Sequence, residues 1–392
     1  MESADSGAAM KELLKSRALQ IYGALLALTH VLSAYFWMDR SLDLVVRSAD
    51  RSSSLCWPFL PYCESLRFVS TGTASTYLQI YAGVGLLTAV LFLIKKIKPA
   101  YFLLLALLAM KLYFTSLSYG LMGNYHYMSF FVQVAFLFLP HKTTMIPFFI
   151  GVFYWGAGIL KLDPEWLSGV SLIHPSFLPA PLQHASLIYA VILECILVVG
   201  LFSQRPWIRY LTLAQFVLFH AFSWHIVGYF YPLTMLLLLG LFVLIPLYQE
   251  SWQAFWDESL QNKKSAVILT AALALLQILP LLLVKDSAAS GAPRLMSLNM
   301  LDARMECETL LIRHQNRAEE VYNPFVKAPS TRTQCDPLVF LSQIESLCQS
   351  SGENFDFWMQ SRRTTELQMQ TRLILRDVCK KSRAELMWAE VL

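Results

Sequence analysis

The chain has 392 residues and a formal net charge of +4; apolar and aromatic residues make up 56% of it and charged residues only 15%. A soluble chain carries about 25% charged residues, so this one could not cover its surface with polar groups in water. The composition excludes disordered chains, fibrous repeats and small disulfide scaffolds, and the net charge is too small to indicate nucleic-acid binding. A polytopic membrane protein remains.

Nine apolar stretches are candidates for membrane-spanning helices. An apolar run of about 20 residues crosses a bilayer as a helix, and backbone polar groups in lipid must be satisfied internally. The fourth and fifth stretches are short enough to be tilted or re-entrant. The nine are Ala18–Met38, Thr76–Ile94, Ala100–Leu121, Tyr125–Leu139, Met145–Leu160, Ala185–Phe202, Trp207–Trp224, Ile226–Leu247 and Ala266–Val284.

Basic residues in the short loops predict the orientation of these spans. If the N-terminus is cytoplasmic, the inner face has the larger share of Lys and Arg. We therefore expect a cytoplasmic segment over residues 1–17, a transmembrane domain over 18–284 and an outer-face domain over 285–392. The inner residues are Lys11, Lys15, Arg17, Lys95, Lys96, Lys98, Lys142, Arg205, Arg209, Lys263 and Lys264, and the outer ones are Arg40, Arg47, Arg51, Arg67 and Lys161.

Three segments are expected to lie outside the bilayer core. Asp39–Ser75 forms an outer loop, and Gln249–Ser265, with Trp252 and Trp256, is typical of an interfacial helix. The tail contains the periodic segments Met305–His314 and Pro337–Cys348. These segments predict a small mixed domain packed on the outer face.

Six of the seven cysteines fall on the predicted outer side. They are Cys56, Cys63, Cys307, Cys335, Cys348 and Cys379, whereas Cys195 lies within a span. This distribution fits an oxidising compartment, and six cysteines allow 15 full pairings. Their spacing matches no zinc site.

Lys161 is the most informative ionisable residue, because it ends an apolar run directly before Leu162 and Asp163. One interpretation is a lysine that snorkels to the interface and pairs with Asp163. The other is a desolvated amine: burial disfavours the charged form, and a neutral amine can act as a general base. Because Lys161 ends a helix, we expect its truncation to leave the fold nearly intact.

Three histidines are predicted at the same membrane depth as Lys161. His126 begins the fourth span, His220 nears the end of the seventh, and His225 follows it. Each alone is more often an interfacial residue than a catalytic one, but four positions at one depth predict a single site that opens to the outer leaflet. Lys111, inside the third span, is expected to be an interior partner or to snorkel, with no catalytic role.

The segment Tyr154–Gly169, with Ala157-Gly158, Lys161-Leu162-Asp163 and Trp166, resembles the vitamin K-dependent gamma-carboxylases and the bacterial membrane proteins that share their transmembrane domain. Phe219-His220 matches a Phe-His of that family. Asn124–Met128 resembles the family's Asn-Asn-His-Ser-Tyr-Leu, with His126 displaced by one position. The resemblance covers roughly residues 20–285 and marks this chain as a shorter, bacterial-type member of the inner membrane.

The resemblance implies an all-α polytopic enzyme with Lys161 as the catalytic base, assisted by His220 and His126. It implies that the quinol-binding residues are Asn124, Tyr127, Trp166 and His225. The co-substrates would be a vitamin K hydroquinone or related membrane quinol, dioxygen and carbon dioxide, with no metal. The implied products are the quinone epoxide and, in a carboxylase, a carboxylated glutamate of a protein substrate.

The resemblance also implies one disulfide between the first outer loop, at Cys56 or Cys63, and the tail.

Besides the enzyme, two other classes of protein remain open: a transporter, and a non-catalytic scaffold built on the same helical bundle. The chain has no inverted repeat and no pair of glycine-interrupted spans, which are typical of transporters. Beyond the quinone, the expected surroundings are membrane lipid and no nucleic acid.

Overall fold

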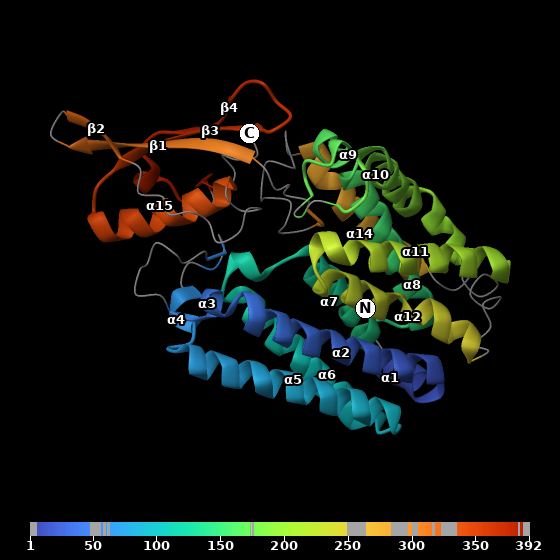
Figure 1. Cartoon of the computed structure of the whole chain (residues 1–392). Coiled ribbons are helices and arrows are strands. Elements are labelled where there is room, and N and C mark those ends of the chain that lie inside the picture. The colour runs from blue at the N-terminus through green and yellow to red at the C-terminus, as the bar shows by residue number, and fades with distance from the viewer. Residues whose placement is uncertain are drawn as a thin grey trace.

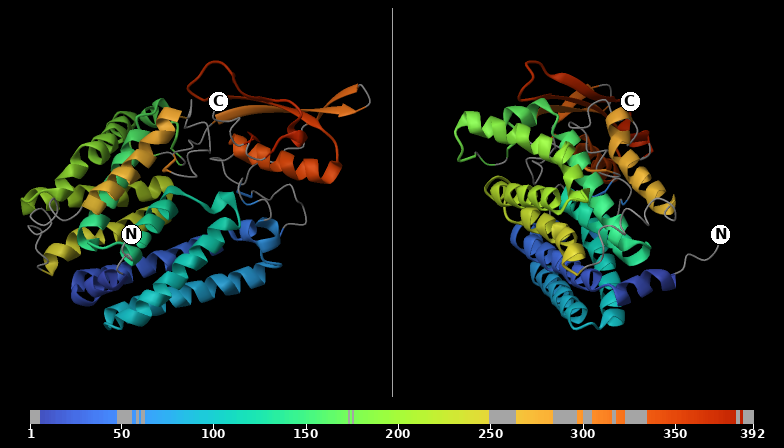
Figure 2. Two further views of the ribbon diagram at one scale, coloured as in Figure 1. Left: turned by 180° about the vertical axis from the view of Figure 1, so that it is seen from behind. Right: turned by 90° about the vertical axis from the view of Figure 1, so that its right-hand side faces the viewer.

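The computed structural model describes residues 6–47, 56–57, 60, 63–172, 174, 176–248, 264–283, 297–299, 305–315, 318–322, 335–382 and 385–386. These residues are mostly helical, with a small β-sheet near the C-terminal end. Figure 1 shows the helices gathered into a bundle, with the sheet and its helix beside one end of it. Figure 2 shows the orange-to-red C-terminal domain at that end from two further directions.

A helix lies at each of the nine predicted span positions. Six of them are long and apolar enough to cross a membrane: α2 (Arg17–Arg40), α5 (Thr71–Leu93), α6 (Ile97–Ser116), α8 (Lys142–Leu160), α11 (Pro206–Val227) and α12 (Phe230–Leu247). The others are α7 (Asn124–Phe138), α10 (Ala180–Cys195) with its extension η3 (Leu197–Phe202), and α14 (Lys264–Leu283). Helices α7 and α10 have only 15 and 16 residues, and within α14 the apolar helical stretch is Val267–Leu279. The described chain therefore contains six helices long and apolar enough to span a membrane, and the nine predicted spans are not all confirmed.

Helix α2 lies at the centre of the bundle and packs against α5 and α12. Ser16 caps its first turn by accepting a hydrogen bond from the Leu19 amide at 3.0 Å. On α5, Gly85 allows close approach, since a Cβ there would lie 2.9 Å from the Val31 side chain. On the α12 side, the Tyr22 hydroxyl donates to the Leu238 carbonyl at 3.1 Å.

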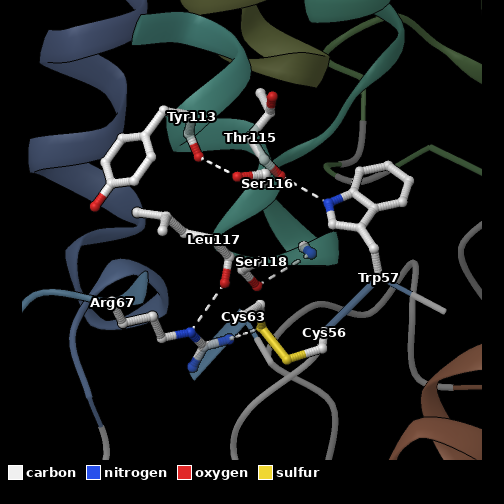
Figure 3. The surroundings of a disulfide bond; sticks show 10 residues. Cys56, Trp57, Cys63, Arg67, Tyr113, Thr115, Ser116, Leu117 and Ser118 are labelled. Carbon is white, nitrogen blue, oxygen red and sulfur yellow. Dashed lines mark hydrogen bonds between the residues drawn. A yellow bond between two sulfur atoms is a disulfide. The ribbon is translucent and has the colours of Figure 1, made fainter. Parts of the chain in front are cut away.

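The first loop, between α2 and α5, is built on short elements: α3 (Leu42–Val45), α4 (Cys63–Leu66) and a parallel bridge between Val46 and Phe68. Figure 3 shows its Cys56–Cys63 disulfide beside the end of α6. The Trp57 indole donates to the Thr115 carbonyl at 2.7 Å, and the buried Arg67 donates to the Leu117 carbonyl at 2.9 Å. These bonds hold the loop on the bundle.

The C-terminal domain is a four-stranded antiparallel sheet with one helix. Its strands β1 (Met305–Gln315), β2 (Ala318–Tyr322), β3 (Phe355–Arg363) and β4 (Gln370–Leu375) lie in the order β2-β1-β3-β4. Alternate residues of β3 are buried, and Phe357 packs with Phe340 of α15 (Pro337–Ser351) at a ring separation of 6.3 Å. The tail thus contains the small sheet-and-helix region that was predicted, whereas its location on the outer face stays a prediction.

The disulfide predicted between the first loop and the tail is wrong. The bridges are Cys56–Cys63, Cys307–Cys335 and Cys348–Cys379, with Cα separations of 5.5, 5.6 and 5.4 Å, as disulfide geometry requires. The loop and the tail meet through apolar contact instead, because Trp57 packs with Leu338 and Val339 of α15. The remaining cysteine, Cys195, is a free thiol.

Four further helices complete the described chain: α1 (Ser6–Lys15), η2 (Tyr119–Leu121), α9 (Pro164–Ser168) and η6 (Val378–Lys380). The predicted interfacial helix Gln249–Ser265 lies outside the described residues, except for its last two. The first loop and the tail contact each other at one end of the bundle, whereas the turn between α5 and α6 lies at the other end (Figure 1).

Candidate functional site

Lys161 lies at a corner between two helices. Its amide donates to the Gly158 carbonyl at 3.1 Å and closes the last turn of α8. Asp163 then caps the short helix α9 (Pro164–Ser168), because its side chain accepts from the Glu165 amide at 2.8 Å. Pro at the first helical position suits a helix start. Gly169, with φ of +81°, ends α9 in a conformation that favours glycine.

The side chain of Lys161 forms a buried ion pair with Glu194 of α10. Their side chains are 6% and 0% exposed. Gly158 permits this pairing, because a Cβ there would lie 3.0 Å from Cβ of Glu194 and 3.1 Å from the Cys195 amide nitrogen. The indole of Trp166 lies 5.2 Å from Nζ, within cation–π range.

A second pair of polar side chains lies beside the first. Nε2 of His220, on α11, is 2.7 Å from the Tyr154 hydroxyl of α8, and both side chains are fully buried. The ring of Tyr231, on α12, lies 5.5 Å from that of His220. Tyr154 and Lys161 are seven positions apart along α8, so they lie on the same face of that helix about two turns apart. We call Lys161, Glu194, Tyr154, His220 and Tyr231 the Lys161 cluster.

Two atoms of the Lys161 cluster have no hydrogen-bond partner within the described chain: Oε1 of Glu194 and Nδ1 of His220. Buried polar atoms are nearly always paired with protein or water. Orphan atoms on both residues therefore leave hydrogen-bonding capacity for a bound molecule or water.

A separate group of buried polar residues lies where α2, α5, α6 and α7 pack together. Nδ1 of His30 is 2.5 Å from the Tyr81 hydroxyl, and its Nε2 is 2.8 Å from Oε1 of Gln133. Nζ of Lys111 donates to Oγ of Ser129 at 2.5 Å. We call His30, Tyr81, Lys111, His126, Ser129 and Gln133 the Lys111 cluster, and each of them is at most 2% exposed.

The predicted site residues divide among three places. Lys161, His220 and Trp166 lie together. His126 belongs to the Lys111 cluster, and the rings of Tyr125 and Phe230 pack on it.

The remaining predicted residues contact other parts of the chain. Oδ1 of Asn124 accepts from the Asn299 amide at 3.0 Å, and the Tyr127 hydroxyl accepts from Gln277 at 3.4 Å. His225 packs on Phe177 at a ring separation of 4.4 Å and lies 3.4 Å from the Ser176 hydroxyl.

Sequence reasoning missed the partners of the predicted residues, above all Glu194 and Tyr154. Glu194 did carry a signal, because it is the only acidic residue in the nine predicted spans, and ionisable residues at membrane depth are often functional. Tyr154 had none, since tyrosine is common in apolar helices.

The C-terminal domain covers the corner that holds Lys161. Asp163, which would pair with Lys161 if that lysine snorkelled to the interface, instead pairs with Arg363 at 2.8 Å. The buried Glu165 accepts from the Thr365 amide at 3.1 Å and from its hydroxyl at 2.9 Å. The loop that follows β3 therefore binds α9 through residues some 200 positions away in sequence.

Comparison with protein-family models, with curated proteins and with solved structures finds no match to this chain. Among the residues that the structure describes, no group of three or more His, Cys, Asp or Glu side chains is placed to hold a metal ion.

Proposed function

We propose that this protein is an integral membrane enzyme that takes a proton from a hydroxyl of a vitamin K-type hydroquinone. It would be a quinol-dependent epoxidase related in chemistry to the gamma-glutamyl carboxylases. One observation carries the proposal: a fully buried Lys161–Glu194 pair lies beside a fully buried Tyr154–His220 pair, at the sequence motif that resembles the carboxylase base.

The residues present suit a quinol. Such a molecule has a flat apolar ring with hydroxyl groups at opposite ends, and it would supply an ionisable hydroxyl and two reducing electrons. Oε1 of Glu194 and Nδ1 of His220 are buried without partners in the described chain, so each can hydrogen-bond a hydroxyl. The rings of Tyr231 and Phe219 lie 5.5 and 5.1 Å from that of His220 and give apolar surface for the quinol ring.

The Lys161–Glu194 pair acts as a unit in this proposal. As an ion pair, Lys161 already carries its proton and is no base. Transfer of that proton to Glu194 gives a neutral amine and a neutral acid, so no buried charge is left uncompensated. The neutral Lys161 amine can then accept the hydroxyl proton. Glu194 thus has a role that the sequence-based mechanism did not include.

Tyr154 and His220 would hold the substrate. With Nε2 of His220 bonded to Tyr154, the other ring nitrogen is free to bond a quinol oxygen and to stabilise negative charge that develops there. Because the side chains of Tyr154, His220 and the Lys161–Glu194 pair are all buried, water is kept away from the strong base that forms during the reaction.

The wider setting belongs to the same proposal. We propose nine spans, a cytoplasmic N-terminus and an outer-face tail in a bacterial inner membrane. Carbon dioxide capture on a glutamate of a protein substrate would follow the quinol step, with dioxygen as oxidant. The C-terminal loop that binds α9 brings the tail to the substrate side of Lys161.

The experiment is incubation of the purified protein with reduced vitamin K and dioxygen, followed by chromatographic detection of the epoxide. We expect epoxide from the wild-type protein and a loss of about 10²–10⁴-fold in Glu194→Gln. Tyr154→Phe should lower quinol affinity through a misplaced His220. Lys98→Met, which changes an exposed lysine, is the matched control and should keep the wild-type rate. If the wild-type protein forms no epoxide, the enzyme proposal is rejected, and a non-catalytic scaffold or a transporter remains as the alternative.

A further inference from the structure

The Lys111 cluster contains a buried amine with no acidic side chain paired to it in the described chain. Lys111 is 2% exposed, and its Nζ donates a hydrogen bond to the Ser129 hydroxyl. Within the described chain it forms no ion pair, unlike Lys161. An uncompensated ammonium group is costly both in a protein interior and in a membrane.

Two more hydrogen-bond donors near Lys111 are buried and unused. Neither ring nitrogen of His126 has a partner in the described chain, although the side chain is 1% exposed. The same holds for Nε1 of Trp37, whose ring lies 5.0 Å from that of His126. A neutral histidine donates one hydrogen bond and an indole donates one, so the cluster lacks acceptors.

The first turn of α7 adds to the positive potential. Helix α7 begins at Asn124, and its N-cap residue is Gly123, which has no side chain to accept from the amides. The amino end of a helix favours negative charge. His126 lies in this turn, and Ser129, the partner of Lys111, lies one turn further along. The Ser129 hydroxyl, which accepts from Lys111, also donates to the His126 carbonyl at 3.1 Å, and this places His126 beside Lys111.

We propose that Lys111, His126 and Trp37 bind a small monovalent anion of carboxylate size. One oxygen of a carboxylate would accept from Nζ of Lys111, and the other from the N–H groups of His126 and Trp37. His30 is not a ligand, because Tyr81 and Gln133 occupy both of its ring nitrogens; it stiffens the wall of the site. This site is separate from the Lys161 cluster and does not depend on quinol chemistry.

Formate is the probe, because it is the smallest carboxylate. Isothermal titration of the purified full chain with sodium formate, at constant ionic strength in sodium sulfate, should give saturable binding of about one formate per chain. Loss of a charge-assisted bond should weaken formate binding by about tenfold or more in Lys111→Met. Lys98→Met changes an exposed lysine on the same helix and should bind formate as the wild type does.

His126→Phe provides a second variant that keeps a buried ring in the aromatic packing but removes both nitrogens. It should fold and should weaken formate binding several-fold, and it decides the question if Lys111→Met does not fold. An absence of saturable heat with wild-type protein would overturn the proposal. Wild-type affinity in folded Lys111→Met, or in folded His126→Phe, would overturn it as well.

Discussion

Replacing Lys161 by Met should destabilise the protein by about 3–5 kcal/mol, because it leaves Glu194 buried without its partner. The side chains of the pair are 6% and 0% exposed, so solvent does little to screen the lost interaction. Met keeps the length of the aliphatic chain and leaves little cavity. This expectation replaces the one from sequence, which treated Lys161 as a helix-end residue whose truncation leaves the fold nearly intact.

A double-mutant cycle gives the magnitude. Glu194→Leu alone should cost about as much as Lys161→Met, since it strands the ammonium group. The double variant removes both charges and should be much closer to wild type, because apolar replacements of buried ion pairs are often neutral. We expect a coupling free energy of about 3 kcal/mol or more.

The assay is the free energy of unfolding in mixed micelles, from titration with sodium dodecyl sulfate followed by circular dichroism. Lys98→Met is the control and should stay within about 0.5 kcal/mol of wild type. If the two single costs add in the double variant to within about 0.5 kcal/mol, the side chains are not coupled, and the buried pair would be refuted.

Three more predictions concern the tail. Peptide mapping without reduction should find each disulfide within its own region, and a peptide joining the first loop to the tail would contradict this. A cysteine introduced at Leu367, which is 94% exposed, should react with a membrane-impermeant thiol reagent in intact cells. A cysteine introduced at the exposed Gln204 should react only after the cells are permeabilised. The reverse pattern would mean that the proposed topology is inverted. Glu165→Ala removes the bonds to Thr364 and Thr365 in the loop after β3 and should speed proteolysis of that loop. The control Asp43→Ala, at an exposed residue, should be cleaved at the wild-type rate. Equal cleavage of the two variants would mean that Glu165 does not hold the loop.

Hydropathy predicted where the helices lie, because an apolar run in lipid has to satisfy its own backbone. It did not predict their lengths. Helix α7 has the 15 residues of its predicted run, but α8 begins at Lys142, three residues before its run, and α10 ends at Cys195, where the backbone changes to η3. The tail segments were predicted correctly because their apolar periodicity reflects burial on one side.

The candidate site was predicted in part. The motif identified Lys161 as a candidate functional residue, and counting the spans predicted that His220 lies at the same depth in the membrane. The partners could not be predicted, because pairing depends on which helices pack together: Lys161 bonds Glu194, 33 residues away, rather than Asp163. Asp163 itself meets Arg363 from the far end of the chain. His126 is one turn from Ser129, but only the packing of α6 on α7 places it near Lys111.

The disulfides show the limit of reasoning by resemblance. The expected bridge between the first loop and the tail would have joined two surfaces that do meet, but they meet through Trp57, Leu338 and Val339. Cys56 has a nearer partner seven residues along the chain. Six cysteines allow 15 pairings, and spacing alone could not choose among them.

The central claim, that Lys161 exchanges a proton with a quinol, is tested most directly by epoxide formation in Lys161→Arg. Arginine keeps the positive charge and can pair with Glu194, so this variant should remain folded where Lys161→Met is weakened. Guanidinium does not give up its proton in a protein and so cannot become the base. We expect a folded Lys161→Arg protein with epoxide formation lowered by about 10²–10⁴-fold. Epoxide formation at the wild-type rate would contradict Lys161 as the base, and with it the proposed enzyme.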